Sequence, residues 1–188
     1  MEADRRVVCA PVAHGVEAYA YAVIEGEQPG RFDAEAARAL GIPAGPLYGR
    51  LKRGETITLP DGRTIHGADL VGFPRPGRTV VFSGDTGPSE NLIGLARNAD
   101  LLVHEATYGQ ADAPLARRAR HSTAAEAAEA ARLAGVCALV LTHFSPRYES
   151  ENGAGLADLL AEAQAIFPDT RLAHDFWSLD VPRRAPEE

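Results

Sequence analysis

Short apolar runs and helix-like periodicities alternate along most of the 188-residue chain. Apolar, β-branched runs bounded by turn formers are typical of strands, whereas apolar residues at three- and four-residue spacing are typical of helices. The pattern predicts strands at residues 7–12, 16–25, 79–83, 101–103, 138–142 and 172–176, and helices at 33–40, 89–98, 123–134 and 155–167. The alternation of the two element types after residue 79 favours an α/β layered fold with helices on one face of the sheet. We expect a single domain over residues 1–188.

Capping signals set the start of the helix that the sequence predicts most strongly. Thr123 and Glu126 have the spacing of a capping box, and the residues that follow are rich in Ala and Leu. The preceding segment, residues 109–120, shows no clear period. We therefore expect an irregular segment that leads into a long, well-capped helix.

Residues 41–54 are rich in Gly and Pro and carry three basic side chains, Arg50, Lys52 and Arg53. So many turn formers are unusual in a packed core, and the stretch is therefore interpreted as an exposed, extended and solvated arm without a helix. A plain surface loop is the alternative. The Asp-Gly turn within residues 60–62 then predicts a β-hairpin across residues 56–66.

Composition narrows the class of protein. A net charge of −7 and a pI near 5.4 argue against a nucleic-acid binder with a wholly basic surface, although a local basic patch remains compatible with them. Cys9 and Cys137 lie in apolar runs without a paired spacing, which favours buried free thiols in a reducing cytosol. No apolar run approaches the roughly 18 residues of a membrane span, and residues 2–6 do not resemble a signal peptide.

Three side chains that bind metals well follow directly after predicted strands: His14, Asp85 and His143. Active sites of layered α/β proteins collect at the carboxyl ends of strands, and a carboxylate there can bridge two cations. Each residue also has an ordinary interpretation. Asp85 would serve as a turn-forming cap, and the two histidines would be partly buried structural residues.

Two further groups accompany these candidates. His121, Ser122 and Thr123 open the predicted helix at residue 124, where backbone N–H groups favour a phosphate. His104 and Glu105 end the strand near residue 103, where a buried side chain would orient a neighbouring ligand.

The order of these motifs resembles the tRNA 3′-processing endoribonucleases of the metallo-β-lactamase fold, the ribonuclease Z family. The matching stretches are APVAHGVEAYAY around His14, GIPAGPLYGRLKRGE from Gly41, VVFSGDTGP around Asp85, ADLLVHEATY around Glu105, HSTAAEAA from His121 and LTHFSPRY around His143. GDT alone occurs in many hydrolases of the fold, whereas the ordered set with the Gly-Pro-rich stretch is specific.

The resemblance implies a fold and a reaction. The fold would be a partial metallo-β-lactamase fold, the carboxyl-terminal part of an αββα sandwich, with a flexible tRNA-binding arm inserted at residues 28–55. The reaction would be zinc-dependent endonucleolytic removal of the 3′ trailer from precursor tRNA in the cytoplasm, by a water activated between two zinc ions. A homodimer is the assembly that the resemblance implies.

The resemblance also assigns roles to individual residues. His14 would ligate one zinc ion, His143 the other, and Asp85 would bridge both. His121, supported by Glu105, would protonate the leaving 3′ oxygen. The remaining assignments concern RNA contacts: Ser122, Thr123 and Arg147 near phosphates or the acceptor stem, and Arg50, Lys52 and Arg53 at the tRNA elbow.

One family motif, HxHxDH, does not occur in the 188 residues. Because this motif supplies most of the family's zinc ligands and its general base, we expect a domain incomplete at its N-terminus, with impaired zinc binding and cleavage. Two alternatives stay open. One is another phosphodiesterase or hydrolase of the same fold, and the other is a non-catalytic fragment that only binds tRNA.

Overall fold

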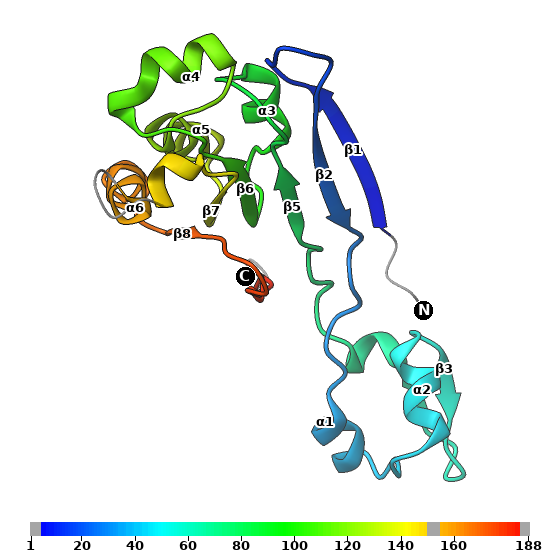
Figure 1. The fold of residues 1–188 in the computed structure, drawn as a ribbon. Helices are drawn as coiled ribbons and strands as arrows, with labels where there is room; N and C mark the ends of the chain where they lie inside the picture. The colour runs from blue at the N-terminus through cyan, green and yellow to red at the C-terminus, as the bar shows by residue number, and fades with distance from the viewer. Residues whose placement is uncertain (1–4, 150–154, 185–188) are drawn as a thin grey trace. The chain divides into compact units, whose positions relative to one another are not determined.

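A six-stranded mixed sheet is the centre of the larger of two units in the chain, which comprises residues 5–25 and 78–183. The computed structural model describes residues 5–149 and 155–184. In spatial order the strands are β1 (Arg5–Pro11), β2 (Tyr19–Glu25), β5 (Thr79–Phe82), β6 (Leu101–Glu105), β7 (Leu139–Thr142) and β8 (Thr170–Leu172) (Figure 1). The pairs β1–β2 and β2–β5 are antiparallel, whereas β5 to β8 pair in parallel. The carboxyl ends of β5, β6, β7 and β8 therefore meet at one edge.

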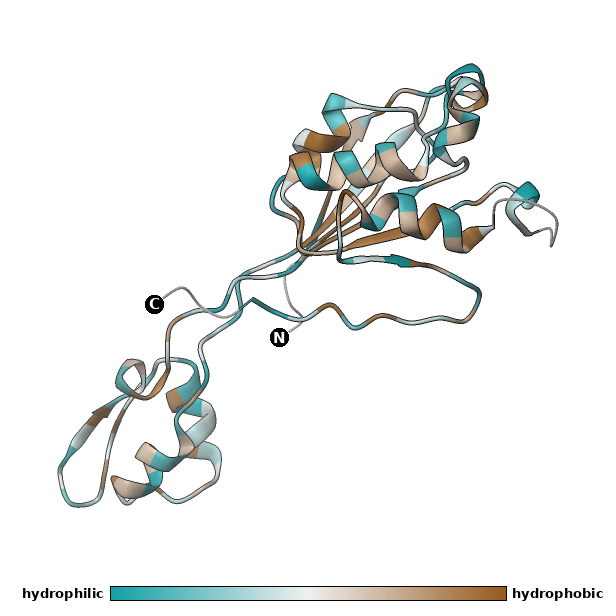
Figure 2. Cartoon of the chain, turned by 90° about the vertical axis from the view of Figure 1, so that its left-hand side faces the viewer, coloured by the Kyte–Doolittle hydropathy of each residue, from teal (hydrophilic) through white to brown (hydrophobic). Residues whose placement is uncertain are grey.

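The two faces of this sheet differ in burial. Ala22, Val81 and Leu102 are fully buried on one face, whereas Tyr21 and Phe82, one position away on their strands, are 47% and 44% exposed. Side chains alternate between faces along a strand, so this contrast places the core on one side. Figure 2 shows helices lying along that side of the apolar strands. The prediction of a sheet covered by helices on one face is confirmed.

The helices of this unit are α3 (Glu90–Leu95), α4 (Ala113–Ala119), α5 (Ala124–Ala134) and α6 (Leu156–Gln164). Helix α5 presents small buried side chains, among them Ala127, Ala128 and Ala131, which let it pack closely on the sheet and on α6. The predicted capping box is present, because Thr123 and Glu126 each bond the other's backbone N–H. No helix in the described part of the chain is long and apolar enough to cross a membrane.

The smaller unit, described over residues 26–77, has its own core. It contains α1 (Ala34–Ala39), α2 (Pro46–Lys52), the predicted hairpin as β3 (Thr56–Thr58) and β4 (Thr64–His66), and a 3₁₀ turn at Gly67–Leu70. Its core consists of six buried side chains: Ala37, Ile42, Leu51, Ile57, Leu59 and Leu70.

The expectation of an extended, helix-free arm at residues 41–54 is wrong. Residues 46–52 form α2, and Leu51 and Ile42 are almost completely buried. The Gly-Pro composition was misleading because Pro46 stands at the start of the helix, where its missing N–H costs nothing. Leu47 and Leu51, four residues apart, then form one apolar face.

Three smaller expectations are also corrected. Residues 109–120 are not irregular, because a 3₁₀ turn at Gln110–Asp112 leads into α4. The last strand is β8 at Thr170–Leu172 rather than residues 172–176. Cys9 and Cys137 are exposed rather than buried. Cys9 lies on the edge strand β1, where almost every residue is exposed, and Cys137 lies ahead of β7.

Candidate metal centre

Three parallel strands deliver acidic or imidazole side chains to the same edge of the sheet. Asp85 follows β5, Glu105 ends β6 and His143 follows β7. Two of the turns need the left-handed backbone region, at Gly84 (φ 61°) and at His143 itself (φ 58°). The Nε2 atom of His143 lies 3.6 Å from Oδ1 of Asp85. These turns therefore bring together two residues that are far apart in sequence.

Two histidines complete the cluster from outside the parallel strands. His14 lies in the loop between β1 and β2, and His121 lies directly before α5. The Nδ1 atom of His14 is 2.9 Å from the carbonyl oxygen of Arg120, and the Arg120 guanidinium donates back to the carbonyl of His14. The rings of His14 and His121 are 4.9 Å apart between centroids.

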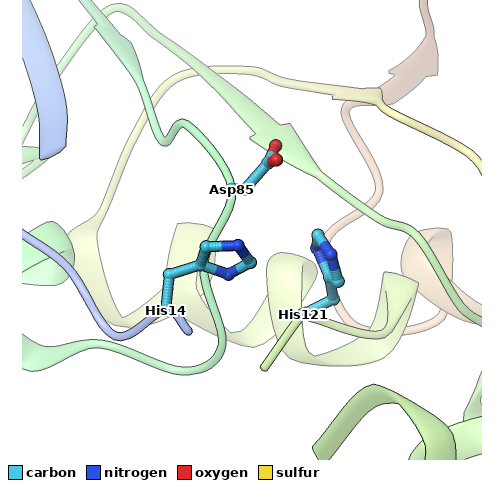
Figure 3. A group of neighbouring side chains, drawn as sticks. All are labelled: His14, Asp85 and His121. Carbon is cyan, nitrogen blue, oxygen red and sulfur yellow. The ribbon is translucent and has the colours of Figure 1, made fainter. Parts of the chain in front are cut away.

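The cluster contains two groups of potential metal ligands. The ligand atoms of His14, Asp85 and His121 lie within 4.8 Å of one another, and Figure 3 shows these three side chains as neighbours. Glu105, His121 and His143 form the second such group. Imidazole nitrogen combined with carboxylate oxygen is a donor set that suits zinc and related divalent metals. The donor chemistry therefore fits a metal at this edge.

Glu105 is the buried hub of the site, with a side chain only 2% exposed. Its Oε1 atom accepts from the backbone N–H of Thr86 at 3.0 Å and lies 2.6 Å from Nδ1 of His121. Its Oε2 atom accepts from both the N–H and the hydroxyl of Thr107, at 3.0 and 2.9 Å. Four donors thus hold one carboxylate and orient the ring of His121.

His104, which the sequence placed beside the site, is buried on β6. Its Nδ1 atom lies 2.7 Å from the carbonyl oxygen of Glu105. Burial lowers the pKa of His104, because the charged imidazolium loses its hydration. His104 therefore belongs to the support of the Glu105 turn, and it stays neutral more readily than an exposed histidine.

The predicted phosphate-binding side chains have partners within the chain. The Ser122 hydroxyl donates to the carbonyl of Thr86, Thr123 caps α5, and both side chains are buried. Arg147 forms an ion pair with Asp112 at 3.2 Å and lies 5.5 Å from the Tyr108 ring. The pKa of Asp112 is lowered first by the hydrogen bond from Tyr148 and then by Arg147.

The three basic residues of α2 and its end also have local contacts. Arg50 and Arg53 both pair with Glu55, at 2.9 Å each, and the Lys52 ammonium lies 5.5 Å from the Phe32 ring. The two arginine side chains are about half exposed. Exposed pairs of this kind contribute little stability and exchange partners readily. A role in RNA binding stays a prediction for these three residues.

Sequence reasoning missed three supporting residues: Thr86, Thr107 and Arg120. Thr107 lies two positions after Glu105, in the ADLLVHEATY stretch, so the motif contained it. Arg120 contributes its backbone carbonyl from the left-handed region (φ 59°), and no pattern in side-chain type reveals a backbone acceptor. The residues that the sequence predicted as ligands do lie together, and metal binding by them stays a proposal.

Comparison with known proteins agrees with this geometry. Residues 55–144 match a family model described as a beta-lactamase superfamily domain. Two solved structures share the fold: human tRNase Z, short form (TM-score 0.55, 22% identity, 97% of this chain, 45% of that chain), and the metallo-beta-lactamase fold protein YhfI from Bacillus subtilis (0.54, 19%, 89% and 46%). The chain therefore shares the metallo-β-lactamase fold of these structures.

Curated sequences narrow the relationship within that superfamily. The chain is 57% identical over 178 residues to Ribonuclease Z from Brevibacillus brevis, a match that covers 94% of this chain and 56% of the relative. It is 54% identical over 184 residues to Ribonuclease Z from Synechocystis sp., covering 98% and 56%. The particular family that the chain matches is therefore ribonuclease Z, and the chain spans about half the length of these relatives.

Proposed function

We propose that the site serves zinc-dependent endonucleolytic removal of the 3′ trailer from precursor tRNA. The observation that carries the proposal is the convergence of His14, Asp85 and His143 beside the Glu105–His121 pair. The sequence around them is more than half identical to proteins named Ribonuclease Z, which supports the choice of substrate. We further propose a cytoplasmic homodimer, for which a dimer mass in size-exclusion chromatography is the test.

The proposed ligands divide between two zinc ions. His14 would hold one, His143 the other, and Asp85 would bridge them through its two carboxylate oxygens. When bound, the metals would lower the pKa of a water molecule and offset the negative charge that develops on the phosphoryl group. The contact of 3.6 Å between Asp85 and His143 supports this division, because one cation can lie against both atoms.

The protein's own proton donor in this proposal is His121. Its Nδ1 atom is held at 2.6 Å by the Glu105 carboxylate, which fixes the orientation of the ring. Its side chain is 16% exposed, so the ring reaches the surface of the cluster while remaining largely enclosed. His121 would therefore deliver a proton to the departing 3′ oxygen from a fixed position.

The smaller unit is the proposed tRNA-binding element. Residues 26–77 contain seven Lys or Arg and six Asp or Glu, whereas the whole chain has a net charge of −7. The excess of positive charge is small but lies in a strongly acidic chain, and Arg50, Lys52 and Arg53 concentrate it at the end of α2. A phosphate backbone would compete with Glu55 for the two arginines.

The test combines precursor tRNA binding with cleavage, using the full chain with added zinc. Because the HxHxDH motif is absent from the 188 residues, we expect their cleavage activity to be weak, and we expect Asp85→Ala to abolish what remains while leaving precursor binding unchanged. We expect the charge reversal Arg50→Glu, Lys52→Glu and Arg53→Glu to weaken binding at least tenfold. The matched control reverses Arg97, Arg132 and Arg171, which lie in the larger unit and change the net charge equally.

Other outcomes of the same assay would replace the proposal. Hydrolysis of a small phosphodiester, unaffected by the reversal in α2 and without tRNA cleavage, would show a different hydrolase of this fold. Filter binding of the precursor without cleavage at any zinc concentration would show a tRNA-binding protein with no nuclease activity.

A further inference from the structure

The hydroxyl group of Thr107 lies between the buried carboxylate and a proposed metal ligand. Its Oγ1 atom is 2.9 Å from Oε2 of Glu105 and 2.9 Å from Nδ1 of His143. Thr107 is 7% exposed, so water does not readily take the place of either partner. Glu105, Thr107 and His143 thus form a chain of hydrogen bonds, in which the single hydroxyl proton of Thr107 can be donated to only one of its two neighbours.

Counting protons decides the direction of both hydrogen bonds. Both oxygens of Glu105 already accept backbone N–H groups, from Thr86 and from Thr107, which leaves the carboxylate as an acceptor only. The Thr107 hydroxyl must therefore donate its proton to Glu105. Its lone pair is then free to accept, so the proton between Thr107 and His143 belongs to Nδ1 of the imidazole.

This direction leaves the other ring nitrogen of His143 unprotonated. That atom, Nε2, is the one that faces Asp85 at 3.6 Å. A neutral imidazole binds a metal through its unprotonated nitrogen, and the hydrogen bond at the other nitrogen sets which one that is. The tautomer needed for a ligand at Nε2 is thus prescribed by groups that do not touch the metal position.

The same tautomer holds at the other two histidines of the cluster by different means. His121 donates from Nδ1 directly to Glu105, and His14 donates from Nδ1 to the carbonyl of Arg120. His143 is the one ring of the three that reaches Glu105 through a third side chain.

We propose that Thr107 is a positioning residue that extends the influence of Glu105 to His143, so that one carboxylate sets the tautomers of two imidazoles. The role in metal ligation rests on the proposed function above, whereas the tautomer is a property of the chain itself. Ser145 donates its backbone N–H to the carbonyl of Thr107, so the two loops stay paired when the side chain changes. The His143 side chain is 49% exposed, and without the hydroxyl its ring is free to turn toward water.

The deciding experiment is ¹⁵N NMR of the imidazole nitrogens in the metal-free chain, at a pH where histidine is neutral. His143 is assigned by the loss of its signals in His143→Gln. We expect a protonated Nδ1 and an unprotonated Nε2 in the native sequence and in Thr107→Ser, which keeps the hydroxyl. In Thr107→Val, which keeps the branched shape, the His143 proton is expected to move to Nε2 or to distribute over both nitrogens.

Control and overturning results are distinct. Thr170→Val removes another buried hydroxyl, one that donates to the carbonyl of Phe167 away from the site, and should leave the His143 signals unchanged. A proton on Nε2 of His143 in the native chain, or the same tautomer in Thr107→Val as in the native chain, overturns the proposal.

Zinc titration then separates this proposal from the proposed function. We expect Thr107→Val to bind Zn²⁺ roughly 10- to 100-fold more weakly than the native chain, and Thr107→Ser to recover most of that loss. A native chain with the expected tautomer but no zinc binding would contradict the proposed metal site and support the positioning role of Thr107. A reversed tautomer with normal zinc binding would support the metal site and contradict the role of Thr107.

Discussion

Gly84 and Tyr19 approach so closely that a Cβ atom on Gly84 would lie 2.8 Å from the carbonyl oxygen of Tyr19. Gly84 also has a positive φ, and it immediately precedes the proposed bridging ligand Asp85. The direction of Asp85 therefore depends on a residue without a side chain.

Gly84→Ala should destabilise the larger unit by about 1–3 kcal/mol, because a backbone clash adds to the strain of the left-handed region. Urea unfolding measures the loss, and zinc titration should show weaker binding as Asp85 shifts. Gly94→Ala is the matched control. Nothing lies within 4 Å of a Cβ there, and Gly94 is part of helix α3, so stability should stay equal or rise by up to about 1 kcal/mol. Equal effects of the two substitutions would contradict the account of the Gly84 turn.

Glu105→Gln should cost about 1–3 kcal/mol of unfolding free energy. The amide that replaces one carboxylate oxygen brings N–H donors toward groups that themselves donate, the N–H of Thr86 or of Thr107. Urea unfolding checks the magnitude. Glu129→Gln, which breaks an exposed ion pair with Arg132, is the control and should leave the midpoint unchanged. A Glu105 variant as stable as the native chain would show that the hub is not needed for folding.

Leu51→Ala should lower the unfolding free energy of the smaller unit by about 2–5 kcal/mol, because Leu51 is fully buried in the separate hydrophobic core of that unit. Hydrogen exchange should accelerate at the amides of Leu59 and Gly67, which bond within the unit. The amides of Leu102 and Ala106, at the parallel strands of the larger unit, should exchange as before. Equal acceleration at all four amides would show that the two units unfold together.

Acid should weaken the larger unit through Glu25. Hydrogen bonds from Arg78 lower the pKa of Glu25 from 4.5 to about 2, and Arg183 adds a further positive charge. A depressed carboxyl pKa means that the stabilisation is complete above about pH 4.5 and is lost as the pH falls toward 2. The loss should be roughly 2 kcal/mol.

Unfolding free energies measured between pH 6 and 2 check this dependence. The Glu25→Gln variant should be less stable near neutral pH and should show a flatter acid limb, because the group that titrates is gone. Glu90→Gln, an exposed substitution in α3, should reproduce the native curve. A Glu25→Gln curve parallel to the native one would assign the acid sensitivity to other carboxyl groups.

Much of the larger unit could be predicted from local patterns. The capping box of Thr123 and Glu126 and the apolar runs of β5, β6 and β7 are properties of short stretches, and the structure has them where the sequence places them. The meeting of Asp85 with His143 also followed from sequence, because the parallel strands of one sheet present their carboxyl ends at a shared edge. The sequence pattern and the parallel arrangement of the strands were together sufficient to predict this contact.

The rest depends on contacts that composition does not record. Helix α2 is held by the burial of Leu51 among residues of the same unit, and this packing outweighs the Gly and Pro content that suggested an extended arm. The part played by Thr107 depends on the rotamers of three side chains, one at the end of β6 and two in loops. Such relationships appear only when the chain is folded.

The proposed ligands come from three separate places along the chain, so a bound metal would also be a cross-link. Asp85 lies about 70 residues from His14 and about 60 from His143, so assembling the site in the unfolded chain would require closing long loops at an entropic cost. Because the unfolded state holds no such cluster, each tenfold excess of zinc over its dissociation constant should add about 1.4 kcal/mol to the stability of the folded state. The melting temperature of the chain should therefore rise with the concentration of free zinc.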